Sequence, residues 1–427
     1  MARDQNALTY RVRRLPPEID KPGVVELLTQ SLATEDCVPT IHVYSLCRSL
    51  DSPETTSAKE ATVTFSALPS QLQGREEWSL TAVYHSVEHH VVVDKQFLDF
   101  TVLSEVPDDE HILDCVAISG LGSHPFGSWQ QRGNPDFMWL RDALPKDLNG
   151  IRTIIYGYDT HLTESKSFKS TYDIALALAN RLVSVGFGWP SAKPVVFLCH
   201  SLGGIIFKET VVILASTSAQ EPSFLGKLRA ALFFGVPNAG MEITQLRTMV
   251  KGDPTEQLIE DLAPRSPRLS SLDSLFSGHQ ATRDFRVVSF YETETTKTVH
   301  FLGSRWVRNG PEVVMVEKES AIQKCSRHPD EVHFIDKDHS AMVKFSRGDV
   351  GYTRVVESLR KFLRHEDVFT FGLRRQTTDI SFASEESDGQ NQDGEIHTSA
   401  IQQKVRAKWF KRRSEGMCSW IIHQHVS

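Results

Sequence analysis

The residues best suited to chemistry lie in segment 194–204, which reads PVVFLCHSLGG. Its apolar run predicts a buried strand, its small residues predict a sharp turn, and an apolar helix begins directly afterwards. This order is the context of a nucleophile elbow, in which a turn lifts a serine above a sheet. The serine is Ser201, and the N–H of Leu202 at the start of the helix would stabilise an oxyanion beside it.

The usual form of this motif is G-x-S-x-G, and Cys199 stands here at the first glycine position. Cysteine is small, so we expect only mild crowding, and Gly203 and Gly204 keep the helix side of the turn open. The alternative is that Ser201 is an ordinary residue of a βα turn.

A nucleophilic serine needs a base, and the base needs an acid that orients it. In this fold the acid and then the histidine follow the serine along the chain. We expect the histidine to follow a last strand at 313–317. His339 lies there in a polar, loop-like context, whereas the rival His333 lies in an apolar run and the rival His328 in a proline-containing loop.

The acid is expected at the end of the preceding strand, predicted at 287–291. Glu292 stands at that end, and Glu294 follows two residues later. Glu317, at the end of the strand predicted at 313–317, is the third candidate, and some of these acids must be ordinary surface residues.

A second oxyanion donor is expected in the loop that reads SGLGSHPFGSW from 119 to 129. Gly120 and Gly122 let the backbone turn, so that the N–H of Leu121 can face a carbonyl oxygen. His124 in the same loop either lines the pocket or lies at the surface.

Residues 111–366 alternate between predicted strands and helices, which indicates a mostly parallel sheet with helices on both faces. We predict strands at 112–119, 153–158, 195–199, 230–234, 287–291 and 313–317, and helices at 137–148, 170–185, 203–215, 256–262 and 353–364. The apolar residues of 241–282 suggest either a lid over an acyl pocket or helices packed on the sheet.

Residues 1–105 form a separate region with predicted strands at 8–15, 40–47, 61–65 and 97–103, and a helix at 24–32. This order, with a short second helix, predicts a small ferredoxin-like βαββαβ module. RNA-recognition modules share that order, but Glu60 and Thr62 stand where stacking rings are required, with Val12 at the matching position of the first strand. A structural or interaction module is therefore expected, without nucleic-acid binding.

The remaining residues, 367–427, form a polar tail that we expect to be largely disordered, with a basic stretch at 404–413. That stretch is expected to be solvated, the alternatives being a nuclear-import or a membrane-surface patch.

Composition limits the class of protein. The chain has 427 residues, a net charge of −7 and six cysteines without any CxxC pair. Such a balance argues against a protein that grips nucleic acid over its whole surface, a disulfide scaffold or a zinc ribbon. No cofactor and no metal are expected. The most apolar stretch, 194–207, is too short to cross a bilayer, so we expect an intracellular, most simply cytoplasmic, protein.

Several segments together carry a resemblance to a known family. They are SGLGSHPFGSWQQRGNPDFMWLRDALPKDL, IIYGYDTHL, CHSLGG, FFGVPNAGM, SFYETE and DKDHSAMVKFS, in this order across about 111–347. They resemble the α/β-hydrolase domains of fungal proteins similar to the serine active-site-containing protein family, within a wider group of serine esterases and GPI inositol deacylases. In fungi such domains often precede NACHT, ankyrin or WD repeats, although no P-loop motif occurs in this chain.

The resemblance implies an α/β-hydrolase fold, a triad of Ser201, His339 and an acid, and ester or lipid substrates. It also implies an association with mitochondria or ER membranes through peripheral contact. The chain departs from the family pattern at Ser119, where histidine is usual, and at Asn238, where histidine is frequent. The functions in view are therefore a serine esterase or lipase, a hydrolase-fold recognition module without turnover, and a lipid acyltransferase. The oligomeric state is left open.

Overall fold

The computed structural model describes residues 8–33, 38–50, 58–159, 168–217, 224–283, 285–302, 305–307, 309–324 and 331–363. All of them fall in one compact unit, residues 1–364. The predicted tail 367–427, with its basic stretch, lies outside the described residues. No helix among the described residues is long and apolar enough to span a membrane.

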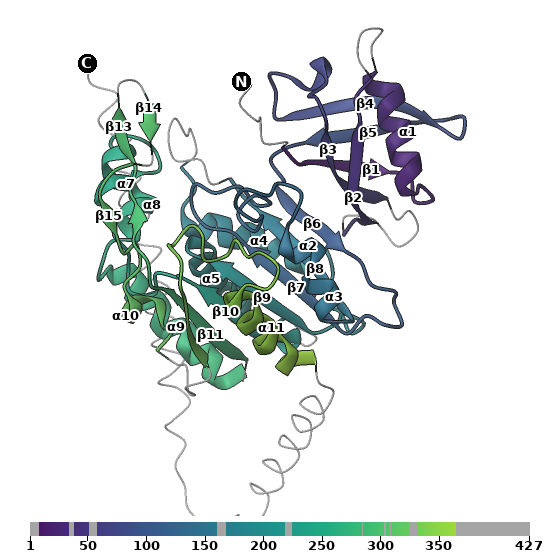
Figure 1. Cartoon of the computed structure of the whole chain (residues 1–427). Coiled ribbons are helices and arrows are strands. Elements are labelled where there is room, and N and C mark those ends of the chain that lie inside the picture. Colours follow the sequence, from purple (N-terminus) through teal and green to yellow (C-terminus); the bar gives the residue numbers. More distant parts are fainter. Residues whose placement is uncertain are drawn as a thin grey trace, which may run out of the picture. The chain divides into compact units, whose positions relative to one another are not determined.

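The N-terminal part is a five-stranded antiparallel sheet, here called the N-terminal sheet, with the strand order β2-β3-β1-β5-β4. Its elements are β1 (Tyr10–Leu15), α1 (Lys21–Leu32), β2 (Ile41–Arg48), β3 (Lys59–Phe65), β4 (Glu77–Tyr84) and β5 (Val87–Asp94). Asp20 caps α1 by accepting the N–H of Gly23 at 2.8 Å. The apolar residues of α1 pack on the sheet. Figure 1 shows this helix, in purple, beside the strands.

The N-terminal sheet differs from the predicted βαββαβ module in three respects. The second helix is only a 3₁₀ turn (Ser70–Leu72), followed by the β4–β5 hairpin. The hairpin turns at His85 and Ser86, whose φ angles of 49° and 64° are those of a type I′ turn without the usual Asn-Gly signal. The predicted strand 97–103 is β6 (Asp99–Ser104), and it belongs to the other sheet.

That other sheet has seven strands in the order β16-β11-β10-β9-β7-β8-β6. The strands are β7 (Leu113–Ile118), β8 (Ile151–Gly157), β9 (Val195–His200), β10 (Leu228–Phe234), β11 (Arg286–Glu292) and β16 (Val332–Ile335) in addition to β6. All pairings are parallel except that of β6 with β8. The predicted mostly parallel sheet is confirmed, and the arrangement is that of the α/β-hydrolase fold.

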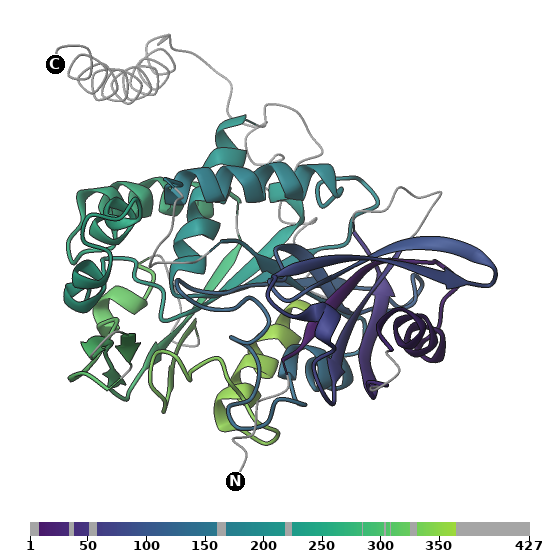
Figure 2. The ribbon, with the colours of Figure 1, turned by 90° about the horizontal axis from the view of Figure 1, so that it is seen from above.

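Helices cover both faces of this sheet, as Figure 2 shows from above. One face carries α4 (Thr171–Ser184), α5 (Leu202–Thr217), α6 (Phe224–Lys227) and α9 (Pro267–Arg283). The other carries α2 (Trp139–Asp142), α3 (Leu144–Asp147) and α11 (Val350–Leu363). The helix predicted at 137–148 is divided at Ala143 between α2 and α3.

The prediction of a last strand at 313–317 is wrong. Only β15 (Glu312–Val313) is extended there, and it pairs with β12 (Thr296–Lys297) in a small ribbon. The last strand of the sheet is β16, a short edge strand that is only partly buried. Its sequence therefore shows little of the apolar pattern that marks a buried strand. Between β12 and β16 lie β13 (His300–Leu302), β14 (Arg305–Val307) and α10 (Lys318–Ala321).

The segment 241–282 forms α7 (Thr244–Met249), α8 (Glu256–Asp261) and most of α9. Leu258, Leu262, Leu272 and Phe276 are buried in the core cluster that contains α5, while Leu275 is exposed. The four buried residues thus pack on the sheet layer.

Candidate active site

Ser201 stands between the end of β9 and the start of α5 with φ of 52°, a left-handed conformation that is rare outside glycine. Its N–H donates to the carbonyl of Phe234 at 2.9 Å, and its own carbonyl accepts from the N–H of Gly204 at 3.0 Å. A Cβ at Gly203 would come within 2.6 Å of the Ile118 carbonyl oxygen, so the helix approaches the sheet only because glycine is present there. This strained strand-to-helix turn has the geometry of a nucleophile elbow.

His339 lies against Ser201, in the loop that follows β16. The distance from its Nε2 to Ser201 Oγ is 3.0 Å, and from its Nδ1 to Glu292 Oε2 is 2.5 Å. A carboxylate can only accept, so Nδ1 carries the proton and Nε2 is free to accept from the serine hydroxyl. All three side chains are at least nine-tenths buried.

Glu292 ends β11 and is fixed from both oxygens. While Oε2 accepts from His339, Oε1 accepts the N–H groups of Met315 and Val316 at 2.8 and 3.2 Å. The alternative acids, Glu294 and Glu317, are exposed. The structure therefore brings Glu292, and neither alternative, to the histidine.

The two rival histidines lie elsewhere. His333 is inside β16 with its ring 5.2 Å from the ring of Phe290. His328 is outside the described residues. Of the three candidates the structure places His339 beside Ser201.

The loop after β7, residues 119–129, here called the glycine loop, lies directly beside Ser201. A Cβ on Gly120 would come within 2.8 Å of Ser201 Cβ. The next N–H along this loop is that of Leu121, and the N–H of Leu202 is among the helix-initial donors that have no intrahelical acceptor. Both predicted oxyanion donors therefore belong to backbone adjoining the serine.

Three contacts to His339 were not anticipated from the sequence. His200 donates its Nε2–H to the His339 carbonyl at 2.9 Å, and Thr296 Oγ1 accepts the N–H of His339 at 3.0 Å. Gly235, with φ of 53°, leaves room for the ring, since a Cβ there would lie 2.8 Å from His339 Nδ1. The glycine after the apolar run FF at 233–234 is the one signal in the sequence that points to such a close approach.

His200 is buried next to Ser201 in the sequence. Burial lowers the pKa of His200 to about 3, so its imidazole is neutral at neutral pH. Its Nδ1 has no hydrogen-bond partner among the described residues. A neutral His200 adds no positive charge next to His339, whose ring centroid lies 5.0 Å from its own.

Cys199, which departs from the G-x-S-x-G motif, and Asn238, which departs from the family pattern, are both buried. Cys199 is buried, and burial raises the pKa of its thiol well above the usual value. Asn238 accepts from Lys208 Nζ at 3.0 Å and donates to the carbonyls of Ser320 and Ala321 at 3.0 and 3.3 Å. Asn238 is therefore engaged in a buried polar cluster with Lys208.

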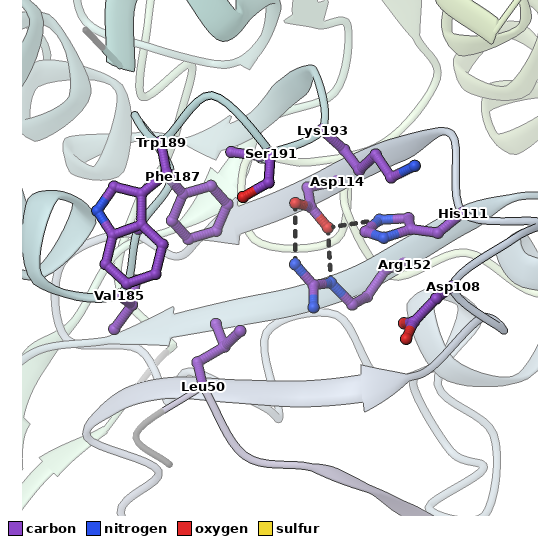
Figure 3. Close-up of a pocket in the computed structure, with 12 residues that line it drawn as sticks. Leu50, Asp108, His111, Asp114, Arg152, Val185, Phe187, Trp189, Ser191 and Lys193 are labelled. Atoms are coloured by element: carbon purple, nitrogen blue, oxygen red, sulfur yellow. Dashed lines mark hydrogen bonds and ion pairs between the residues drawn. The ribbon is translucent and has the colours of Figure 1, made fainter. Parts of the chain in front are cut away.

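A separate cavity of about 340 Å³ lies at the amino ends of β7, β8 and β9, opposite the end that carries Ser201. In Figure 3, Asp114 on β7 faces Arg152 on β8 and also His111. Arg152 binds Asp114 with two hydrogen bonds of 2.6 and 3.0 Å, and His111 Nε2 lies 3.0 Å from the same carboxylate. These groups lower the pKa of Asp114 against the effect of its burial, which makes this cluster a paired structural one.

The face of the N-terminal sheet that RNA-recognition modules use is covered. Glu60 is buried, and its Oε1 accepts the N–H of Val102 on β6 at 2.6 Å. Arg11, paired with Thr62, shares this face, whereas Val12 points to the α1 side, so the predicted alignment of β1 is one residue out of register. Among the described residues no group of His, Cys, Asp or Glu is arranged to hold a metal ion.

Comparison with known proteins places these features in context. No family model matches the chain. The chain is 26% identical over 203 residues to Protein SERAC1 of Bos taurus and to that of Homo sapiens, covering 43% of this chain and 30% of each relative. The chain thus spans less than a third of the length of these curated relatives.

Solved structures with similar chain traces include lipase BlEst2 of Bacillus licheniformis, with a TM-score of 0.39 and 13% identity over 61% of this chain and 97% of that one. A lipase-esterase related protein of Clostridium acetobutylicum has a TM-score of 0.33 and 12% identity over 62% of this chain and 99% of that one. The expected relation to fungal receptor-like proteins stays a prediction.

Proposed function

We propose that the chain is a serine hydrolase that cleaves carboxylic esters through an acyl-enzyme. The observation that carries the proposal is the continuous hydrogen-bonded series from Ser201 through His339 to Glu292, with distances of 3.0 and 2.5 Å. Serine is a weak nucleophile unless a base removes its proton as it attacks, and this series provides the base and orients it.

The steps of the reaction follow from the positions of these atoms. Ser201 Oγ forms a bond to the ester carbonyl carbon while its proton passes to His339 Nε2, and the carbonyl electron pair moves onto oxygen. The N–H groups of Leu202 and Leu121 stabilise this oxyanion. Its collapse breaks the bond to the leaving alkoxide, which takes the proton from His339. Water then repeats the sequence on the acyl-enzyme, and Glu292 holds the histidine in one tautomer throughout.

A fluorophosphonate probe tests this proposal, because it phosphylates an activated serine. We expect labelling of the wild type and none of Ser201→Ala, with loss of ester hydrolysis in the same variant. Ser274→Ala is the matched control, since Ser274 is an exposed serine of α9. If wild type and Ser201→Ala label equally, or neither labels, the chain is instead a binding module of hydrolase fold.

Lipid acyl esters are the finer part of the proposal, supported by the family resemblance of the segments between 111 and 347. Rates on p-nitrophenyl esters of increasing chain length, and on phospholipid vesicles, test it. A preference for long chains with sedimentation on vesicles supports a lipid substrate and a peripheral membrane contact, and a preference for acetate contradicts both. Product analysis with an added alcohol separates hydrolysis from acyl transfer. An intracellular location is proposed with it, because Cys47, Cys115 and Cys199 are unpaired.

A further inference from the structure

The N-terminal sheet and the large sheet are joined by a buried polar contact at the edge strand β6. One edge of β6 pairs with β8, and groups on its other edge meet side chains of the N-terminal sheet. Arg11 donates to the carbonyls of Leu98 and Phe100 at 2.9 and 3.3 Å, and Glu60 accepts from Val102 as described above. Side chains thus satisfy backbone groups that an open edge strand would leave unpaired.

The same arginine holds the segment between the two sheets, residues 94–99, here called the junction. Arg11 Nε donates to Asp94 at 2.9 Å, and Asp94 also accepts the N–H of Phe97 at 2.8 Å. Phe97 and Asp99 have φ angles of 53° and 68°, conformations that non-glycine residues keep only where their surroundings fix them. The junction is therefore held in one shape from the side of the N-terminal sheet.

The junction in turn holds the glycine loop. His124 of that loop donates its Nε2–H to the carbonyl of Lys95 at 2.5 Å, while its Nδ1 accepts the N–H groups of Phe126 and Gly127 at 3.2 and 3.0 Å. Phe97 is fully buried, with its ring centroid 5.5 Å from that of His124 and 5.1 Å from that of Phe126. One imidazole thus closes a turn inside the loop and ties this turn to the junction.

The other end of the glycine loop is fixed against Ser201. Ser123 Oγ donates to the carbonyl of Gly120 at 2.6 Å, and the backbone of Gly120 is in close contact with Ser201. Only Leu121 and Gly122 separate these two anchored residues. The position of the Leu121 N–H is therefore determined by contacts that reach from the N-terminal sheet to the serine.

We propose that the N-terminal sheet acts as a positioning element for the oxyanion donor of the large sheet, through the His124–Lys95 hydrogen bond. This inference rests on the proposed hydrolase function. Under it, His124 is a positioning residue that does not touch the substrate, and the N-terminal sheet contributes to turnover without contributing to substrate binding.

Two substitutions at His124 separate its two hydrogen-bonding functions. Asparagine places an acceptor near the position of Nδ1 but is too short to reach the Lys95 carbonyl, whereas glutamine places an N–H donor near the position of Nε2. Removing an oxyanion donor outright costs about 10²- to 10³-fold in kcat. For His124→Asn we expect kcat to fall at least about tenfold, as a part of that effect, with little change in KM. For His124→Gln we expect most of the activity to be retained.

The control is His90→Ala. His90 is an exposed histidine on β5 and takes no part in the contacts between the junction and the glycine loop. It should leave kcat and KM unchanged. Melting temperatures are measured in parallel, and Phe97→Leu provides a further test if His124→Asn does not fold. That variant keeps an apolar side chain but loses the ring contact with His124, so its kcat should fall at unchanged KM.

Fluorophosphonate labelling of the wild type keeps the two proposals distinguishable. An unlabelled wild type overturns the hydrolase function itself. If the wild type is labelled and hydrolyses esters while His124→Asn, or Phe97→Leu in its place, has the same kcat, the function stands and the positioning role is overturned. A lower kcat in His124→Asn, together with a kcat close to that of the wild type in His124→Gln, supports the inference.

Discussion

The substitution Glu292→Gln tests the candidate triad most sharply, because the structure dictates how the new amide must sit. Oε1 of Glu292 accepts two backbone N–H groups, those of Met315 and Val316. The glutamine oxygen will keep that position, since an NH₂ group there would face two donors. Its NH₂ group therefore faces Nδ1 of His339, at the position where the carboxylate accepted a proton.

The consequence is a change of tautomer. His339 can meet an NH₂ group only with an unprotonated Nδ1, so its proton moves to Nε2, and Nε2 can no longer accept the proton of Ser201. The same change in a serine protease lowers kcat by about 10⁴-fold. We expect a similar loss here, which corresponds to about 5.5 kcal/mol of transition-state stabilisation, with a small change in KM.

Steady-state hydrolysis of a p-nitrophenyl ester measures this loss, with Glu294→Gln and Glu317→Gln as matched controls. Both controls alter exposed carboxylates and should have the activity of the wild type. The reasoning is refuted if Glu292→Gln stays within about tenfold of the wild-type kcat, instead of the 10⁴-fold loss of a wrong tautomer, or if either control loses more activity.

Three further outcomes are expected. Gly235→Ala should lower kcat more than about tenfold, because its Cβ would lie 2.8 Å from His339 Nδ1, and unchanged kinetics would contradict that contact. Because the unfolded state protonates His200 below its ordinary pKa of 6.5 and the folded state only near 3, the free energy of unfolding should fall as the pH is lowered between these values. Urea denaturation measures the slope of the free energy of unfolding against pH, to which His200 contributes at most about 1.4 kcal/mol per pH unit. The slope should be smaller in His200→Asn, and equal slopes in the two proteins would contradict the contribution of His200. Lys208 Nζ lies 2.7 Å from Asp273 Oδ1, and the exposed Lys324 lies 3.9 Å from the other oxygen. Lys208→Met leaves buried Asp273 with only this exposed cation and should cost about 3–5 kcal/mol in denaturation experiments. Exposed Lys251→Met is the control, and a smaller loss would show that the cluster relaxes.

The elbow at Ser201 could be predicted because its signal is local. A buried strand, a turn of small residues and an apolar helix are contiguous in 194–215, and each leaves its own pattern in the sequence. The structure has these elements as β9 and α5, with Ser201 between them. A turn whose signal lies in contiguous residues can therefore be predicted without knowledge of the rest of the chain.

The pairing partners of a strand could not be predicted in the same way, because the residues of a strand do not show which sheet it will join. Of the segment predicted as extended, 97–103, residues 99–103 lie in β6, yet β6 pairs with β8 and not with the N-terminal sheet. The shape of the junction directs β6 to the large sheet. This shape includes positive φ angles at Phe97 and Asp99, which the sequence does not indicate because neither residue is a glycine. The turn of the β4–β5 hairpin likewise has no sequence signal, since His85 and Ser86 occupy it with positive φ angles.

The choice of the acid was open in the sequence because Glu292, Glu294 and Glu317 all follow apolar runs. The structure separates them through contacts distant along the chain. Glu292 is paired in register with Ile335 of β16, which brings the end of β11 beside the loop of His339. The backbone of residues 315–316 folds back to bind its second oxygen, an arrangement that the incorrectly predicted strand 313–317 would not have allowed.

Glycines at the ends of neighbouring strands mark the same location more reliably than the acids do. Gly120 follows β7, Gly203 follows β9 and Gly235 follows β10, and at each of them a Cβ would come within 2.8 Å of another part of the site. Parallel strands deliver their carboxyl ends to one edge of a sheet, so a glycine required after each strand means that the backbone there is approached closely. At Gly120 and Gly235 the approaching groups are Ser201 and the ring of His339, whereas at Gly203 they are the backbone carbonyls of Ile118 and Ser119. Gly120 and Gly235, which follow two other buried apolar runs, therefore carry information about the site that the single motif CHSLGG does not contain.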